Sequence, residues 1–190
     1  MSLHVALVHF PIIDKRGEAV CTSVTNLDMH DLSRAATTYD VDTAWVVHPY
    51  DAQRRFIDRV MRHWRDGWGA AYNPSRREAL SRTKLVPTIY DVADGIEAAE
   101  GRRPILVGTH AAPVANSISY RDLRRRIDTE PDQSFCVIFG TGWGLHPELM
   151  AELDLMLDPI YGPVPWNHLS VRAAIGIILD RLRGLDHPLM

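Results

Sequence analysis

A glycine-rich run in the last third of the chain is the first segment that could do chemistry. The apolar stretch Phe135–Phe139 is followed by Gly140, Gly142 and Gly144 in the run FGTGWGL. Glycine has no Cβ, so the backbone amides and carbonyls here are open to close approach by a ligand. The spacing is GxGxG and the run lies late in the chain, unlike the dinucleotide-binding fingerprint. Viewed alone, the run fits equally well a glycine turn that leads into a helix near Pro147.

A second segment with chemical potential follows in the run Leu157–Leu182. Its first part is an apolar turn with Pro159 and Gly162, and it continues to Asn167 and Ser170, either of which could cap a helix. The first half of that helix carries small residues, which allow another backbone to approach closely: Ala173, Ala174 and Gly176. The same residues also fit an amphipathic helix whose apolar face is simply buried.

The third segment, Thr22–Val41, combines a polar start with an expected helix. The polar start contains Thr22, Ser23, Thr25 and Asn26. In the helix that follows, His30 and Arg34 are four residues apart and therefore share one face. A surface arginine in a helix is ordinarily solvated, so the polar start is what gives this segment functional character.

A basic stretch, residues 51–84, has nine Lys or Arg side chains against four Asp or Glu. Phosphate binding by Arg54, Arg55, Arg62 and Arg76 is one interpretation, and a solvated charged face is the other. The segment Gly67–Ser75 is rich in aromatic residues, Gly and Pro, and is expected to be an exposed loop. Aromatic side chains in and beside this loop could stack on unpaired bases or pack the loop onto the body: Trp64, Trp68 and Tyr72.

The composition narrows the class of protein. A chain of 190 residues with 46% hydrophobic content is expected to form one domain over residues 1–190. The formal charge of −3 gives no general attraction to nucleic acid, so any RNA contact must be local. The two cysteines, Cys21 and Cys136, lack zinc-site spacing, and no metal is expected. No apolar run is long enough to cross a bilayer and no leader is visible, so no membrane contact and a cytoplasmic location are expected.

Short apolar runs alternate with stretches of helical spacing, which is typical of strands joined by crossover helices. The expected strands are Val5–Phe10, Thr43–His48, Lys84–Thr88, Pro104–Thr109 and Ser134–Phe139. The expected helices are Asp28–Thr38, Ala52–Arg65, Ile96–Glu100, Tyr120–Thr129, Pro147–Leu153 and His168–Arg183. This pattern predicts an α/β fold, a mostly parallel sheet with helices on both faces, and a ligand site at the carboxyl ends of the strands.

Taken together, the three segments resemble the knotted SPOUT methyltransferases. Asn26, Arg34 and Ala35 are similar to the first motif of that superfamily, Phe139–Leu145 to the second, and Leu157–Ala174 to the third. The match runs in order over nearly the whole chain. The three motifs TSVTNLD-HD, FGTGWGL and NHLSVR are similar to those of a small bacterial group of S-adenosylmethionine-dependent RNA methyltransferases.

The resemblance implies a carboxyl-terminal trefoil knot, a homodimer, S-adenosylmethionine as cofactor and tRNA or rRNA as substrate, methylated at guanine N1 or a ribose 2′-oxygen. It assigns a functional role to Arg34, reaching into the partner's site. Our hypothesis is that Arg34 positions or activates the RNA nucleophile and Asn26 orients the same region, with His30 or His168 as the proton acceptor. Arg172 would meet substrate phosphate or else pair with an acid. The implied cofactor contacts are Thr109, Gly140, Thr141, Gly142, Gly144, Leu157, Ile160, Gly162, Asn167, His168, Leu169 and Ser170.

One departure from better-known members is Trp143, which stands where many relatives have an acidic residue. Two other classes of function stay open. One is a flavodoxin-like nucleotide-binding protein in which FGTGWGL holds a phosphate, although the residues after Gly144 do not form the basic or hydroxyl-bearing helix start that such a site needs. The other is a non-enzymatic RNA-binding dimer of the same fold.

Overall fold

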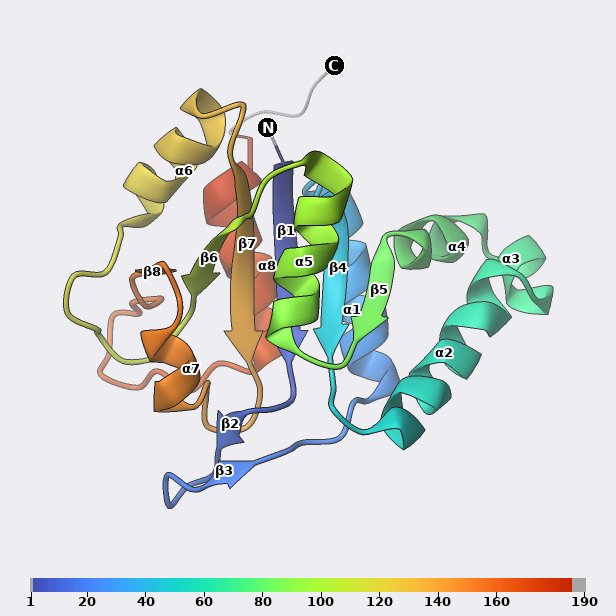
Figure 1. Cartoon of the computed structure of the whole chain (residues 1–190), viewed down its shortest axis with the longest axis horizontal. Helices are drawn as coiled ribbons and strands as arrows, with labels where there is room; N and C mark the ends of the chain where they lie inside the picture. Colours follow the sequence, from blue (N-terminus) through green and yellow to red (C-terminus); the bar gives the residue numbers. More distant parts are fainter. Residues whose placement is uncertain (1, 186–190) are drawn as a thin grey trace.

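The computed structural model describes residues 2–185 and places six parallel strands in one sheet, in the order β5-β4-β1-β7-β6-β8 (Figure 1). The strands are β1 (Ser2–Val8), β4 (Thr43–Val47), β5 (Thr83–Val86), β6 (Ile105–Gly108), β7 (Ser134–Gly140) and β8 (Leu155–Met156). A separate antiparallel hairpin, β2 (Ile12–Ile13) and β3 (Ala19–Val20), lies at the carboxyl edge of the sheet. The expected single domain over 1–190 extends beyond the described residues and stays a prediction.

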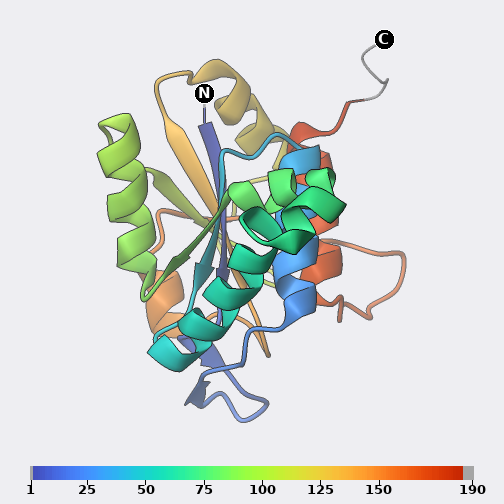
Figure 2. The same cartoon turned by 90° about the vertical axis from the view of Figure 1, so that its right-hand side faces the viewer.

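Helices cover both faces of the sheet, as the alternating pattern predicted (Figure 2). One face carries α1 (Asn26–Thr38), α2 (Asp51–Arg65), α4 (Pro74–Ser81), α6 (Tyr120–Thr129) and α8 (Val171–Arg183). The opposite face carries α5 (Ile89–Glu100) and α7 (Pro147–Ala151). The short helix α3 (Trp68–Tyr72) links α2 to α4 beyond the β5 edge of the sheet.

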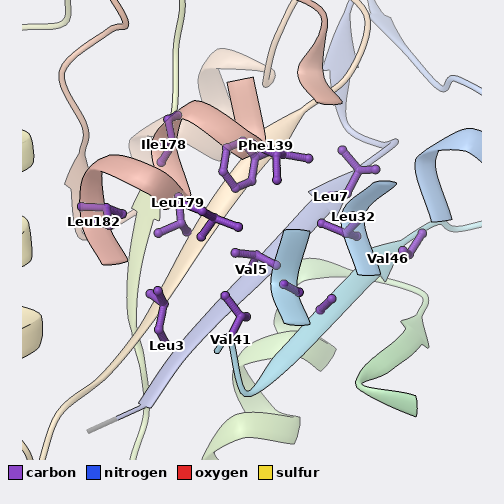
Figure 3. Packing of buried hydrophobic residues seen from close by; sticks show 14 of the residues in the cluster. Leu3, Val5, Leu7, Leu32, Val41, Val46, Phe139, Ile178, Leu179 and Leu182 are labelled. Atoms are coloured by element: carbon purple, nitrogen blue, oxygen red, sulfur yellow. The ribbon is translucent and has the colours of Figure 1, made fainter. Parts of the chain in front are cut away.

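The side chains of β1 show why this strand is central. Leu3, Val5 and Leu7 point to the face covered by α1 and α8 (Figure 3). Ala6 and Val8 belong to the cluster on the face covered by α5. All of them are buried, because a parallel strand between two helical layers has no solvent face. Both neighbours, β4 and β7, pair with β1 in parallel register.

The strand order excludes the flavodoxin-like alternative. In a flavodoxin-like sheet the later strands follow one another outward in chain order. Here β7 lies between β1 and β6, and β8 then pairs with the outer side of β6. After β7 the chain therefore passes back across β6 to reach β8.

Two expectations about local structure were wrong. The segment Gly67–Ser75 is not an irregular loop, because it contains α3 and the start of α4. The Asn73 side chain caps α4 and Pro74 takes its first position, where proline starts a helix without breaking one. The helix expected over Ile96–Glu100 begins at Ile89, since Thr88 and Asp91 form a reciprocal cap there.

The two leucines of α1 make a matched test of this packing. Leu32 is fully buried against the sheet, whereas Leu27 is 58% exposed. Leu32→Ala is expected to lower the free energy of unfolding by about 2–5 kcal/mol through the lost contacts and the cavity left behind. Leu27→Ala should change it by no more than about 0.5 kcal/mol. Urea titration followed by circular dichroism measures both, and equal losses would contradict the packing described here.

Candidate active site

A cavity of about 620 Å³ opens at the carboxyl ends of β6 and β7. Three segments form its wall: residues 109–113 after β6, residues 139–144 at the end of β7, and residues 158–171 leading into α8. Ala174 and Ile178 of α8 close its inner side. Its position agrees with the general rule that parallel sheets bind ligands at the carboxyl ends of their strands.

The glycine turn, residues 140–144, is held against the sheet by β2 and by β1. Ile13 accepts a hydrogen bond from the Trp143 amide at 3.1 Å and donates its own amide to the Gly144 carbonyl at 3.0 Å. Gly142 and Gly144 have φ angles of 60° and 113°, which only glycine adopts without strain. A Cβ built on Gly144 would lie 3.7 Å from His110, another residue of the cavity wall.

The opposite wall is the segment 157–170, which is fixed by hydrogen bonds to the end of β6. The Leu157 amide donates to the Gly108 carbonyl at 2.8 Å, and the Asp158 amide donates to Ile118 at 3.0 Å. Farther along, the Asn167 side chain donates to the Ala111 carbonyl at 2.7 Å. Ser170, one of the two expected candidates, caps α8 by accepting from the Ala173 amide.

Ten of the twelve residues predicted to contact the cofactor line this one cavity. They are Thr109, Gly140, Thr141, Gly142, Gly144, Ile160, Asn167, His168, Leu169 and Ser170. The structure does not bring the other two there. Leu157 is 1% exposed and belongs to the core beneath the cavity. Gly162 is exposed, and no atom lies within 4 Å of the position that a Cβ would take there.

Other residues of the wall were not predicted as contacts, among them Trp143, His110, Tyr120 and Asp158. Trp143 is 60% exposed, and the His168 ring lies 6.3 Å from it and 4.7 Å from Trp166. Asp158 accepts a hydrogen bond from Ser117. The signal for His110 was its position directly after Thr109, whereas nothing local in the sequence indicated Tyr120.

The three residues predicted for catalysis all lie on α1 and none of them lines the cavity. Asn26 and Arg34 are exposed, and Arg34 faces α4 beside Asn73 and Ser75. His30 packs edge-on against Trp64 of α2, with ring centroids 5.7 Å apart. Burial lowers the pKa of His30, and the nearby Arg76 and Arg34 guanidinium groups lower it further.

The arginines predicted to bind RNA divide into two groups. Arg54 donates to the carbonyls of His48 and Pro49, each at 2.6 Å, and Arg76 stacks over the Trp64 ring at 4.4 Å. Arg172 pairs with Asp31 at 3.3 Å, so of its two predicted contacts, substrate phosphate or an acid, the structure shows the acid. In contrast, Arg55 and Arg62 are 71% and 66% exposed on α2, and within residues 2–185 they pair with carboxylates of their own helix.

His9, directly after β1, is a buried histidine that the sequence did not single out. It is 1% exposed and its Nδ1 lies 3.0 Å from the Thr22 hydroxyl. Desolvation by burial lowers the pKa of His9 to about 4, with Asp28 acting in the opposite direction. His9 is therefore neutral at physiological pH.

A family model described as SAM-dependent RNA methyltransferase matches residues 2–184. The chain belongs to this family. S-adenosylmethionine (SAM) is accordingly the methyl donor, and RNA is the class of substrate. The resemblance in the three segments thus led to the right kind of enzyme.

Relatives of this methyltransferase differ in length. A protein of Aquifex aeolicus with no assigned activity is 43% identical over 181 residues, which cover 95% of this chain and 88% of that protein. Two proteins named tRNA (guanine-N(1)-)-methyltransferase, from Oleidesulfovibrio alaskensis and Nitratidesulfovibrio vulgaris, are 37% and 40% identical. The match covers 96% of this chain but only 42% of each of them. Those names describe proteins more than twice as long.

Solved structures share the fold of this methyltransferase at low sequence identity. TrmJ from Z. mobilis superposes with a TM-score of 0.60 at 14% identity, over 96% of this chain and 69% of that chain. The SpoU methyltransferase AviRb from Streptomyces viridochromogenes, solved with AdoMet, gives 0.53 at 18% identity, over 95% and 56%. These likenesses confirm the α/β fold with its parallel sheet.

Within residues 2–185, no helix has the length and apolar character needed to cross a membrane. Over the same described range, no three His, Cys, Asp or Glu side chains gather in a way that would hold a metal ion.

The low pKa of His9 makes a prediction about pH. Because the unfolded chain titrates near 6.5 and the folded protein near 4, protonation favours unfolding between these values. The contribution of His9 to stability is fully present above pH 6.5 and falls by roughly 3 kcal/mol as the pH drops to about 4. The His9 ring resonance followed by NMR should titrate with a midpoint near 4, and a midpoint near 6.5 would show that this burial is wrong.

Proposed function

We propose that this chain methylates a nucleotide of tRNA or rRNA, with the cavity at the ends of β6 and β7 as its SAM site. The observation that carries the proposal is the convergence of the glycine turn and the segment 157–170 on one cavity, in a chain of this family. A volume of about 620 Å³ is within the usual range for a site that encloses a small ligand. Both guanine N1 and a ribose 2′-oxygen are candidate targets.

The residues of the wall fit this cofactor. The glycine turn leaves backbone groups open for polar contacts, and Ile160 and Leu169 supply apolar surface for an adenosyl group. Asp158 is a carboxylate in a wall that would face a sulfonium cation. When bound, SAM supplies a methyl carbon that leaves sulfur as its bond to the RNA nitrogen or oxygen forms, and the nucleophile loses one proton. The task of the protein is alignment of the nucleophile and management of that proton.

We infer that the proposed catalytic arginine acts across a homodimer. Arg34 lies outside the cavity of its own chain, beside α4. The starts of α1 and α8 adjoin, because Arg172 pairs with Asp31. Large apolar side chains are exposed just before the start of α8: Val164, Trp166 and Leu169. A second copy covering this surface would place the partner subunit's Arg34 within reach of the cavity.

The return of the chain across β6 after β7 supports a trefoil knot. The segment 157–170 runs past residues 108–118 and is bonded to them through Leu157, Asp158 and Asn167 before α8 packs behind β7. We propose that this segment passes through the loop between β6 and α6. The knot would hold both walls of the cavity in place without a disulfide or metal.

RNA contact is assigned to the exposed side of α2 and α3. Arg55 and Arg62 are available to phosphates at little cost, since exposed pairs within a helix contribute about 0.3–0.5 kcal/mol. Trp68 and Tyr72 stack on each other with centroids 4.7 Å apart and are 70% and 69% exposed. Their free faces offer a platform for unpaired bases. Arg54, Arg76 and Arg172 instead support the fold.

Two glycines test the cofactor site. Gly144→Val places a side chain in the wall beside His110 at a φ that disfavours it, so calorimetry should show a loss of SAM affinity of at least about tenfold. Gly162→Ala is the control and should bind as the wild type does. Methylated nucleosides in RNA from a strain lacking the gene, measured by mass spectrometry, should return with wild-type protein and with Gly162→Ala only. SAM binding without any RNA product would favour the non-enzymatic dimer.

Subunit mixing tests the role of Arg34. Arg34→Ala and Gly144→Val should each lack methyl transfer. If Arg34 serves the partner's cavity, the mixed dimer has one complete site, and an equal mixture should recover about a quarter of wild-type activity. No recovery, in a mixture shown to exchange subunits, would place Arg34 in the site of its own chain, and full activity of Arg34→Ala alone would place it outside catalysis.

A further inference from the structure

A buried chain of hydrogen bonds runs from His9 to the glycine turn and has no part in the function described so far. It joins the carboxyl ends of β1 and β7 through Thr22, which lies in the segment between β3 and α1. His9 is 1% exposed and Thr141 is 8% exposed. The Thr22 hydroxyl lies 3.0 Å from His9 Nδ1 and 2.6 Å from the Thr141 hydroxyl.

The direction of these bonds follows from counting hydrogens. The Thr141 hydroxyl donates to the Val8 carbonyl at 3.1 Å, so it accepts from Thr22. Thr22 has then used its only hydrogen and accepts from His9, which requires the proton of the neutral imidazole on Nδ1. His9 Nε2 is buried without a hydrogen-bond partner. This arrangement leaves Nε2 as an unpaired acceptor and satisfies every hydroxyl along the chain of bonds.

The backbone of Thr22 is held as firmly as its side chain. Its amide donates to the His9 carbonyl at 3.1 Å, and its carbonyl lies 3.1 Å from His48 Nε2. His48 Nδ1 accepts from the Tyr50 amide, so Nε2 is the protonated nitrogen and donates to Thr22. Residues after β1, β4 and β7 therefore all converge on Thr22.

Thr22 also leads directly into the helix that carries the proposed catalytic residues. Thr25 and Asp28 form the reciprocal cap of α1, and Asp28 lies 3.9 Å from Arg172 of α8. The Thr22–Thr141 bond thus connects the start of α1 to the wall of the cavity. Because the Thr141 hydroxyl is engaged in this chain of bonds, its hydrogen is not free for a ligand in the cavity.

We propose that His9 and Thr22 are positioning residues that hold the glycine turn in the shape required for binding SAM, and hold the start of α1 against it. The consequence for SAM binding rests on the proposed function, whereas the effect on the turn does not. Buried networks of this kind are sensitive to the loss of one member, since the partner left behind is unsatisfied. A site that loosens by a fraction of an ångström loses affinity or rate without unfolding.

Matched variants separate the hydrogen bonds from packing. Thr22→Val keeps the shape and removes the hydroxyl, and Thr22→Ser keeps the hydroxyl. His9→Asn retains an amide donor near the Nδ1 position, whereas His9→Gln places its amide near Nε2. Two readouts apply: hydrogen exchange of the Thr141, Trp143 and Gly144 amides in ligand-free protein, and SAM affinity by calorimetry. Amides of α5, on the opposite face of the sheet, report any global loss of stability.

Thr22→Val and His9→Gln should each speed exchange of the turn amides and weaken SAM binding by roughly tenfold, with α5 unchanged. Thr22→Ser and His9→Asn should keep exchange rates and SAM affinity within about threefold of wild type. The double variant Thr22→Val/His9→Gln should bind SAM only a little more weakly than either single variant, because both substitutions break the same chain of hydrogen bonds. If Thr22→Val exchanges like Thr22→Ser, the proposal is wrong. If wild type binds no SAM while the exchange pattern holds, the proposed function fails and the positioning role stands.

Discussion

The return of the chain from β7 to the outer side of β6 is the constraint on which the site depends. The Leu157 amide bonds to the Gly108 carbonyl, and the stretch that follows bonds to residues 111 and 118 before α8 begins. That path sets the segment 158–170 opposite the glycine turn. Without these bonds the two walls would be unrelated surface loops. The ligand site is thus a result of strand order, since β7 occupies the place between β1 and β6.

Much of the fold follows from local pattern. Apolar runs such as Ser134–Phe139 predicted buried strands, and the glycine spacing at 140–144 predicted a turn with open backbone. The strand order was not predicted, because it is a long-range property that periodicity does not contain. The helix Ile89–Glu100 was predicted too short, because its start signal, the reciprocal cap of Thr88 and Asp91, was overlooked. The glycines, aromatics and single proline at 67–75 were mistaken for loop signals, although Pro74 at the first position of a helix favours helix formation.

The predicted site residues lie together where backbone geometry decides their place, and lie apart where side-chain partners decide it. The glycines and Asn167 line the cavity because their segments must pass there. Arg54, Arg76 and Arg172 are equally basic in the sequence, yet each is committed to a carbonyl, a ring or a carboxylate of the folded chain. His9 could not be found from its neighbours, because its role depends on Thr22 and Thr141, which lie far from it along the chain.

The central claim is that the glycine turn and the segment 158–170 enclose the adenosyl part of the cofactor. A crystal structure with S-adenosylhomocysteine, the demethylated product, tests this most directly. The account predicts density for the adenosine between residues 140–144 and 158–170, with the former methyl position facing a second subunit. Density at another edge of the sheet, or an arrangement in which the two segments lie far apart, would contradict it.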